Sequence, residues 1–142
     1  MNILSGIEST SSALNAERLR MEVVSQNIAN ANTTGSPDGT HYKRQQISFE
    51  SVIRNQMGPN SWSFPLQEVR VSGITSDDAP PRLIYKPGHP HADADGMVAM
   101  PNINVHEEMV DLMAASRAFE ANLAVVQTAK QIAQRTLTIG QK

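Results

Sequence analysis

The 142-residue chain contains no cysteine, which excludes disulfide bonds and thiolate metal sites. Its 12 basic and 14 acidic residues leave a formal net charge of −2, which excludes the basic excess of a dedicated nucleic-acid binder. No apolar run approaches the roughly 18 residues that a transmembrane helix needs. Residues 1–6 lack the basic segment and the continuous apolar segment of a conventional secretory signal. We therefore expect no such signal. A chain of this length predicts one modest domain.

Recognisable catalytic signatures are also missing. The chain has no glycine-rich phosphate loop, no Gly-x-Ser-x-Gly and no His-Glu-x-x-His; His106 and Glu107 begin the last of these, but no second histidine follows. The basic cluster of Tyr42, Lys43 and Arg44 is short enough to be an ordinary strand edge rather than a phosphate contact. The sequence therefore predicts no enzyme, no catalytic residue, no cofactor and no nucleic-acid partner.

Proline is confined to the middle of the chain. All eight prolines lie between positions 37 and 101, together with five of the six aromatic residues. Because proline disrupts the interior of a helix, only the two ends are suited to long helices. We therefore expect a mainly α fold with a small β insert. It divides into an N-terminal axial helix over 1–34, a central β-rich and loop region over 35–101, and a C-terminal axial helix over 102–142, the two helices forming one discontinuous domain.

The N-terminal segment repeats apolar residues at heptad spacing. Alternating steps of four and three residues from Ile3 meet apolar side chains except at Thr10 and Glu17, which indicates a helix rather than a strand. Leu19 and Val23 lie off this seam and give the helix a second apolar face. A globular helix with a wide core stripe explains the spacing as well as a coiled coil does.

The C-terminal segment carries a cleaner seam, which is broken only at Ser116 and Lys130. Asn104 is a suitable N-cap, and Glu107 three residues later completes a capping-box pattern. A helix is therefore predicted over about 104–138.

Helices of this length would be roughly 45–50 Å long, and the middle of the chain is too small to cover both apolar stripes. The economical arrangement pairs the two helices as a coiled coil and leaves apolar faces for other copies or other proteins. The chain is thus expected to be a building block. The residues expected at its assembly interface are Ile7, Leu14, Met21, Val24, Asn27, Ile28, Asn30, Met109, Leu112, Phe119, Leu123, Val126 and Leu137.

Between the helices, short runs favour strands. The candidates are separated by turns rich in proline, glycine and aspartate, and they predict a small sheet of three or four strands. Residues 51–66 are expected to form a loop or an interaction arm. The strand candidates are 47–49, 69–71, 83–85 and 97–100.

One segment of the central region allows two interpretations. His89, His91, Asp93 and Asp95 lie within seven residues and are possible ligands of a divalent metal. Alternatively, this is a polar loop in which Asp95 and Gly96 form the turn and Asp93 accepts hydrogen bonds from backbone amides. Because no cysteine or further histidine lies nearby in sequence, the loop is favoured and no metal site is predicted.

Residues 25–35, SQNIANANTTG, form a recognisable motif. They resemble the N-terminal signature of bacterial flagellar axial proteins, the rod and hook family. Asn27 and Asn30 lie one helical turn apart, where their amides can bond neighbouring backbone or helix surfaces. The last four residues of the motif suit a helix end and a change of chain direction.

The resemblance extends over most of the chain. Residues 37–44 and 85–104 look like insertions of the C-type, proximal-rod members of this family, and residues 107–122 are similar to the family's second helix. Only about 51–66 lies outside it.

The resemblance implies a structural subunit of the proximal rod, the periplasmic drive shaft of the flagellar basal body that transmits torque for motility. It implies export by the flagellar type III apparatus without a Sec signal, and self-assembly of terminal helices into concentric coiled-coil tubes. The implied partners are other copies, rod subunits of the B, F and G types, the hook–basal body adaptor protein E and, as a further candidate, the membrane-ring protein. The less favoured alternatives are a coiled-coil adaptor or export-linked scaffold and a metal-dependent enzyme.

Overall fold

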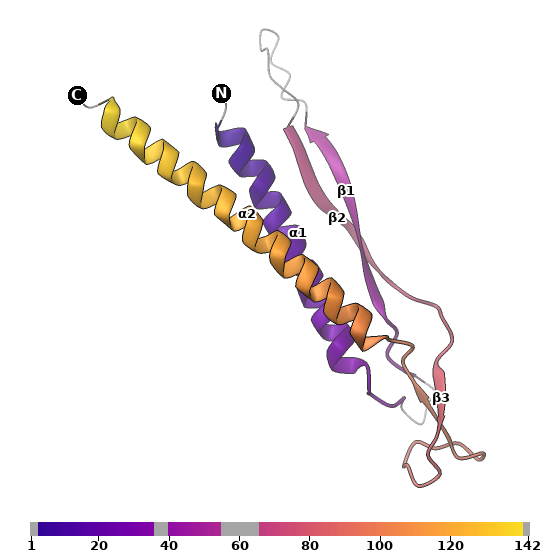
Figure 1. The fold of residues 1–142 in the computed structure, drawn as a ribbon. Helices are drawn as coiled ribbons and strands as arrows, with labels where there is room; N and C mark the ends of the chain where they lie inside the picture. The colour runs from indigo at the N-terminus through magenta and orange to yellow at the C-terminus, as the bar shows by residue number, and fades with distance from the viewer. Residues whose placement is uncertain (1–2, 36–39, 55–65, 141–142) are drawn as a thin grey trace.

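A computed structural model describes residues 3–35, 40–54 and 66–140. Its two long helices lie side by side and run in opposite directions (Figure 1). The mainly α fold with a small antiparallel β region is therefore confirmed. The elements in chain order are α1 (Ile3–Asn30), β1 (Gln45–Arg54), β2 (Leu66–Ser76), β3 (Arg82–Tyr85), β4 (Met97–Met100) and α2 (Val105–Ile139).

The end of α1 and the start of α2 both lie close to the positions that the sequence predicts. Helix α1 stops at Asn30, whose carbonyl accepts hydrogen bonds from the backbone N–H of Thr33 (3.1 Å) and from its hydroxyl (2.7 Å). At the start of α2, Asn104 is the N-cap: its Oδ1 accepts from the His106 N–H at 3.2 Å, and its Nδ2 donates to Glu107 Oε1 at 2.9 Å. These bonds satisfy groups that a helix terminus otherwise leaves unpaired.

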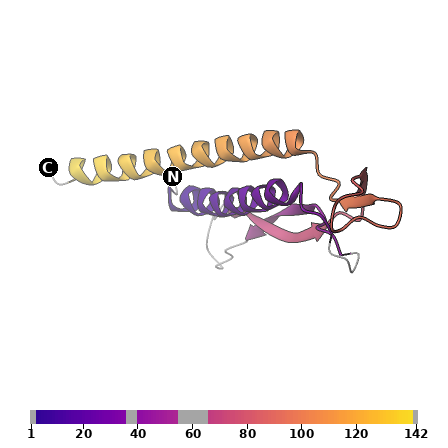
Figure 2. The same ribbon diagram turned by 90° about the horizontal axis from the view of Figure 1, so that it is seen from below.

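The elements form three layers, with α1 in the middle. Figure 2 shows α2 on one side of α1 and the β1–β2 hairpin on the other. Ser9 and Ser12 attach β2 to α1: the Ser9 hydroxyl donates to the Gln67 carbonyl at 2.8 Å, and Ser12 Oγ accepts from the Val69 N–H at 3.2 Å. Helix α1 thus supports both outer layers.

The prediction of one sheet with three or four strands is wrong. In the described part of the chain, β1 pairs with β2 and β3 pairs with β4, each antiparallel, in two separate two-stranded sheets. The physical reason lies between β2 and β3, where Pro80 and Pro81 offer no backbone donor and interrupt the strand. Of the predicted arm 51–66, the two ends belong to β1 and β2, and 55–65 lies outside the described residues.

The core is small and lies at one end of the helix pair. Helix α2 buries only Glu108 and Ala115, so residues 116–139 include no buried side chain. The C-terminal part of α2 also extends past the N-terminal end of α1 (Figures 1 and 2). The subunit therefore covers the beginning of α2 and leaves the rest largely open. The buried apolar residues are Ala16, Val23, Val24, Ala31, Val98, Met100, Ile103 and Ala115.

Neither helix, as far as the structure describes them, combines the length and hydropathy that crossing a bilayer requires.

Candidate assembly surfaces

The expected interface residues of α1 lie mostly against the subunit itself. Val24 and Asn27 are buried, Asn27 with only 1% of its surface exposed. Asn30 uses its Nδ2 to donate to the Gln26 carbonyl of its own helix at 2.8 Å. Their contact with neighbouring subunits stays a prediction. The half-buried members of the set are Ile7, Leu14, Met21, Ile28 and Asn30.

The expected interface residues of α2 are more open. Leu112, Phe119 and Val126 are half-buried, whereas Met109 and Leu123 are exposed. Leu137, in the part of α2 that extends past α1, is 70% exposed. These residues supply apolar surface that the subunit does not cover, although their contact with a neighbour is likewise a prediction.

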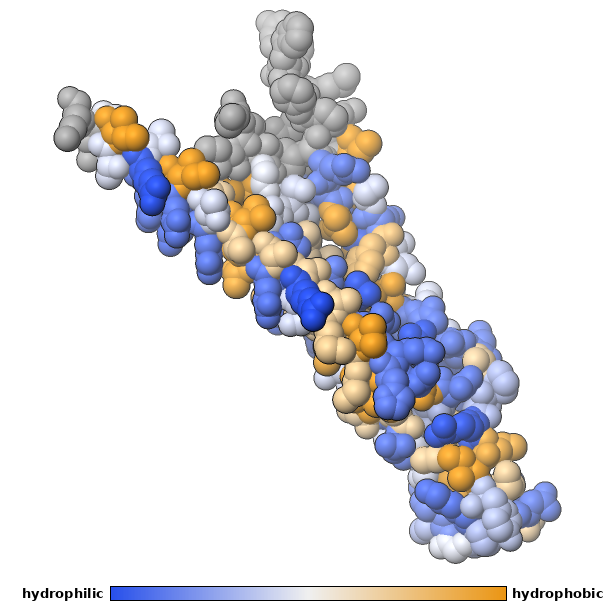
Figure 3. Space-filling model, viewed as in Figure 1, coloured by the Kyte–Doolittle hydropathy of each residue, from blue (hydrophilic) through white to orange (hydrophobic). Residues whose placement is uncertain are grey.

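Helix α2 carries a second apolar surface, called here the outer stripe, most of which was missed by following a single heptad seam in the sequence. At 100° per residue, the members of the outer stripe span about 60° of arc. The centre of the stripe is turned about 120° from the buried face of α2. All its members are exposed, from 50% at Ile132 to 76% at Ile139 among the large ones. Figure 3 shows apolar side chains along the whole visible length of α2. The outer stripe consists of Val110, Ala114, Ala121, Val125, Ile132 and Ile139.

Spacing alone identifies the outer stripe, because its members follow one another at intervals of four or seven residues. With the exposed Met109 and Met113 on the other flank, α2 is apolar on both sides of its contact with α1. The subunit itself leaves these apolar side chains exposed. Exposed apolar surface of this kind is typical of an interaction site.

Five residues from three segments form a polar network around two buried side chains, Asn27 and Glu108, and it is called here the junction cluster. The other three members, Tyr42, Arg44 and Gln45, are half-buried. Asn27 Nδ2 donates to Glu108 Oε2 at 3.0 Å and to the Gln45 carbonyl at 2.8 Å. Asn27 Oδ1 accepts from the Tyr42 hydroxyl at 3.0 Å and from the Gln45 N–H at 2.9 Å. Arg44 Nε donates to Glu108 Oε1 at 2.7 Å. The cluster therefore joins α1, the start of β1 and the first turn of α2.

The carboxylate of Glu108 is the least expected part of this cluster. Its side chain is 1% exposed, yet each oxygen accepts a hydrogen bond, so the buried charge is compensated by Arg44. Neither the heptad spacing nor the capping pattern assigned Glu108 a role. Glu108 lies four residues before Leu112, which places it on the packed face of the helix. This spacing is the feature of the sequence that could have indicated its burial.

The short basic cluster is also used within the subunit. Lys43 Nζ lies 2.7 Å from Asp78 Oδ1, while Tyr42 and Arg44 bond Asn27 and Glu108. The Lys43 contact holds the pKa of the Asp78 carboxyl below its usual range through a hydrogen bond and charge attraction. The cluster thus pairs with acidic and amide groups of the same chain.

Burial raises the pKa of the Tyr42 phenol, and the negative charge of Glu108 raises it further. A group with a raised folded-state pKa stabilises the fold fully below its ordinary value, near 10, and loses that contribution as the pH rises through the folded-state value. Ionised Tyr42 would also lose the proton that it donates to Asn27.

We expect the Tyr42→Phe variant to lose less stability than the wild type when the pH is raised above 10, because it lacks the group that must ionise. Urea unfolding followed by helical circular dichroism at a series of pH values measures this difference. Tyr85→Phe, at an exposed position of β3, is the matched control. Identical alkaline profiles for the wild type and Tyr42→Phe would show that Tyr42 is not linked to folding.

The loop interpretation of the histidine-rich segment is confirmed. Asp93 Oδ1 accepts from the N–H groups of Asp95 (3.0 Å) and Met97 (2.8 Å). Gly96 has φ +74°, and a Cβ there would lie 3.0 Å from Tyr85 Cε2, so this turn requires glycine. The predicted turn and amide capping are therefore both present.

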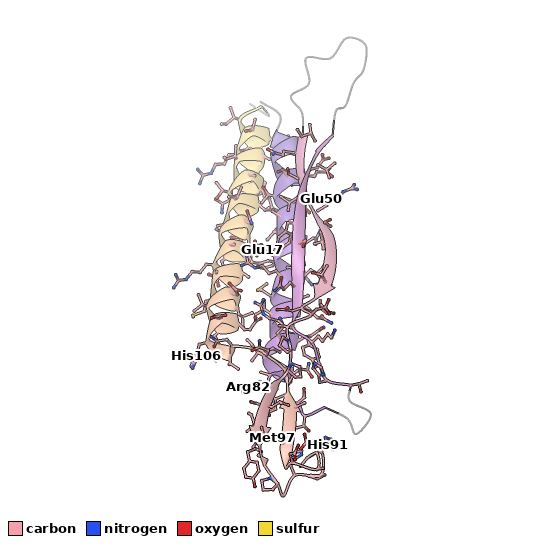
Figure 4. All side chains as sticks on the ribbon, turned by 90° about the vertical axis from the view of Figure 1, so that its right-hand side faces the viewer. Glu17, Glu50, Arg82, His91, Met97 and His106 are labelled. Carbon is pink, nitrogen blue, oxygen red and sulfur yellow. The ribbon has the colours of Figure 1, made fainter. Side chains whose placement is uncertain are left out.

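The two histidines of this loop bond within the subunit. His91 Nδ1 lies 2.9 Å from the Thr34 hydroxyl, and the His91 N–H donates to His89 Nδ1 at 3.1 Å. Figure 4 labels both His91 and Met97 at the end of the β3–β4 sheet that points away from the helices. No group of three or more potential metal ligands occurs within the described ranges 3–35, 40–54 and 66–140.

Comparison with known proteins assigns the paired helices and their signature segments to one family. A family model described as "Flagella basal body rod protein" matches residues 7–35, and one described as "Flagellar basal body rod FlgEFG protein C-terminal" matches residues 94–139. The flagellar basal-body rod protein FlgC of Borreliella burgdorferi is 40% identical over 98% of both chains. Its namesake in Yersinia enterocolitica is 40% identical over 99% of this chain and 100% of its own, and that of Bacillus subtilis is 35% identical over 99% of both.

The chain belongs to the FlgC family of flagellar basal-body rod proteins. The resemblance found in the sequence is thereby confirmed. As a member of the FlgC family, the protein is a structural component of the basal-body rod and not an enzyme. The two matched segments contain nearly all of α1 with its motif and the whole of α2, the elements that carry the candidate assembly surfaces.

Proposed function

We propose that the chain is a subunit of the proximal rod, and that it assembles with neighbouring subunits through the exposed apolar faces of α2. The outer stripe is the observation that carries this proposal. It extends from Val110 to Ile139, and all its members are exposed in the described part of the chain. An exposed apolar surface of this length is typical of an interaction site.

The composition of the outer stripe favours another helix as the occupant. Ala114 and Ala121 leave room for close approach of a neighbouring backbone, and Val125, Ile132 and Ile139 supply area to bury. Fully burying one such side chain contributes about 1.5–3 kcal/mol. Burial of several such side chains in each subunit would therefore add up to a strong contact between subunits. A shaft that transmits torque requires strong contacts of this kind.

The heptad seams support a coiled-coil arrangement of the terminal helices. Within the subunit, α1 and α2 pack along each other, and part of each seam is half-buried, including Leu14 and Met21 on α1 and Leu112 and Phe119 on α2. We propose that this arrangement continues between subunits as concentric tubes. The outer face would be formed by the central region with its two small sheets.

The wider setting of the proposal follows from family membership. The rod would lie in the periplasm and its subunits would be exported by the flagellar type III apparatus without a Sec signal. Rod subunits of the B, F and G types and the hook–basal body adaptor protein E are the proposed neighbours in a homo- and hetero-oligomeric helical assembly. The membrane-ring protein is a further candidate at the base.

Cysteine cross-linking in isolated basal bodies tests the proposal, because the native chain has no cysteine. Ala121→Cys, on the outer stripe, should form cross-linked products with another rod subunit. Ala115→Cys, which is fully buried on the same helix, is the matched control and should form none. Basal bodies that lack the chain, or equal cross-linking from both positions, would overturn the proposal.

A further inference from the structure

The junction cluster raises the question of what a buried charged group does in a protein with so small a core. Replacing a buried ion pair with well-packed apolar residues is often neutral or stabilising, so a buried pair is weak evidence for a stability role. The best-attested alternative is that a buried polar group selects one alignment of two helices among several.

The apolar pattern of α1 and α2 does not select one alignment. Leu14, Met21 and Ile28 follow one another every seven residues, as do Leu112, Phe119 and Val126 on α2. Sliding α2 along α1 by one turn or one heptad, about 5 or 10 Å, again places apolar side chains opposite apolar side chains. The apolar contacts between the helices therefore lose little free energy when α2 slips.

The polar contacts of the junction cluster, by contrast, can form in only one alignment of the two helices. Asn27 Nδ2 meets Glu108 Oε2 at 3.0 Å, and both side chains are only 1% exposed. In either slipped alignment the carboxylate would be buried without Asn27 or Arg44, which is far more costly than the loss of an exposed ion pair. We propose that Asn27, Arg44 and Glu108 are positioning residues that fix the alignment of α2 along α1.

Alignment determines where the far end of α2 lies. The cluster is at the first turn of α2, whereas Val125, Ile132 and Ile139 lie in the part of the helix where the subunit buries nothing. A slip at the cluster therefore displaces the outer stripe by the same 5 or 10 Å. The cluster would thus position the assembly surface without contacting a neighbour. The alignment itself is a property of the single chain and does not depend on the proposed rod function.

A competing anchor exists in the chain that leads into α2. Met100 and Ile103 are buried just before the helix, and the Gly35 N–H donates to the Ala99 carbonyl at 3.2 Å. If these contacts alone held α2 in place, removal of the polar cluster would leave the alignment unchanged. The experiment has to separate these two anchors.

The test uses the full chain with spin labels at Ser11→Cys on α1 and Gln127→Cys on α2, two exposed positions outside the cluster. Pulsed dipolar spectroscopy measures the distance between the labels, and dilution with unlabelled protein removes intermolecular signal. The decisive variant is Arg44→Met/Glu108→Leu, which replaces the ion pair with apolar side chains. Asn27 keeps its bonds to Gln45 and Tyr42 in that variant.

We expect one distance in the labelled wild type and in Glu108→Gln, which retains the shape and an acceptor. The apolar variant should keep its helical content but show further populations displaced by about 5 or 10 Å. Weakening the partly exposed Arg20–Asp111 contact (3.7 Å) by Asp111→Asn is the matched control and should leave one distance. A single wild-type distance in the apolar variant would overturn the proposal. So would its unfolding, which would assign stability rather than alignment to the pair.

Discussion

Glu108→Ala is expected to lower the free energy of unfolding by about 3 kcal/mol, the lower end of what breaking a buried ion pair costs. The substitution leaves the Arg44 guanidinium and the Asn27 amide without their shared acceptor. The Arg44 side chain is 25% exposed and reaches water, which keeps the loss at the lower end. Because natural domains of this size have only about 5–15 kcal/mol of stability, the change is large. Urea unfolding followed by helical circular dichroism measures it.

Two variants separate the effect of burial from that of charge. Glu108→Gln retains the volume and one acceptor oxygen, so it should cost about 1 kcal/mol, the net worth of an ordinary hydrogen bond. Asp111→Asn weakens a contact of 3.7 Å between partly exposed groups on the same two helices, and it should cost under about 0.5 kcal/mol. The account given for Glu108 fails if Glu108→Ala is no more destabilising than Asp111→Asn.

Local sequence signals predicted the helices well, because their causes are local. The proline-free ends, the heptad steps and the Asn104 N-cap placed the second helix at about 104–138, and the structure has it at Val105–Ile139. The turn around Asp93 and Gly96 was predicted for the same reason, since an aspartate and a glycine three residues apart determine it together.

The junction cluster was not predicted, because its partners lie far apart in sequence. Arg44 and Glu108 are separated by 64 positions, and Asn27 and Glu108 by 81. Periodicity shows that Glu108 lies on the packed face of its helix but not which group compensates its charge. Pairing of four short strands is similarly non-local, and here Pro80 and Pro81 separate them into two sheets.

The outer stripe was partly accessible from sequence, since Val125 belongs to a series of apolar residues at intervals of four or seven. The structure adds that Val110, Ala121, Ile132 and Ile139 share its face and remain exposed. Whether an apolar helix face is covered depends on the neighbouring elements, and this is visible only once α1 and the hairpin are placed on the other side.

Val125→Asp/Ile132→Asp is therefore expected to abolish rod assembly and motility while leaving the subunit folded. The two side chains are 55% and 50% exposed in the free subunit, so their replacement removes few contacts within it. In the assembly the same positions would be buried against a neighbouring helix, where an unpaired carboxylate costs several kcal/mol of binding free energy. Every neighbouring pair of subunits would carry the penalty, so a polymer is affected more than a single dimer.

Swimming in soft agar and the protein content of isolated basal bodies measure the outcome, and circular dichroism of the purified variant checks its fold. Gln127→Asp/Gln131→Asp adds the same two charges to exposed polar positions of the same segment and should swim normally. This comparison distinguishes a loss of apolar contact from a change in net charge. Normal motility and incorporation of Val125→Asp/Ile132→Asp would show that the outer stripe faces water in the rod, and that α2 assembles through its other flank around Met109 and Met113.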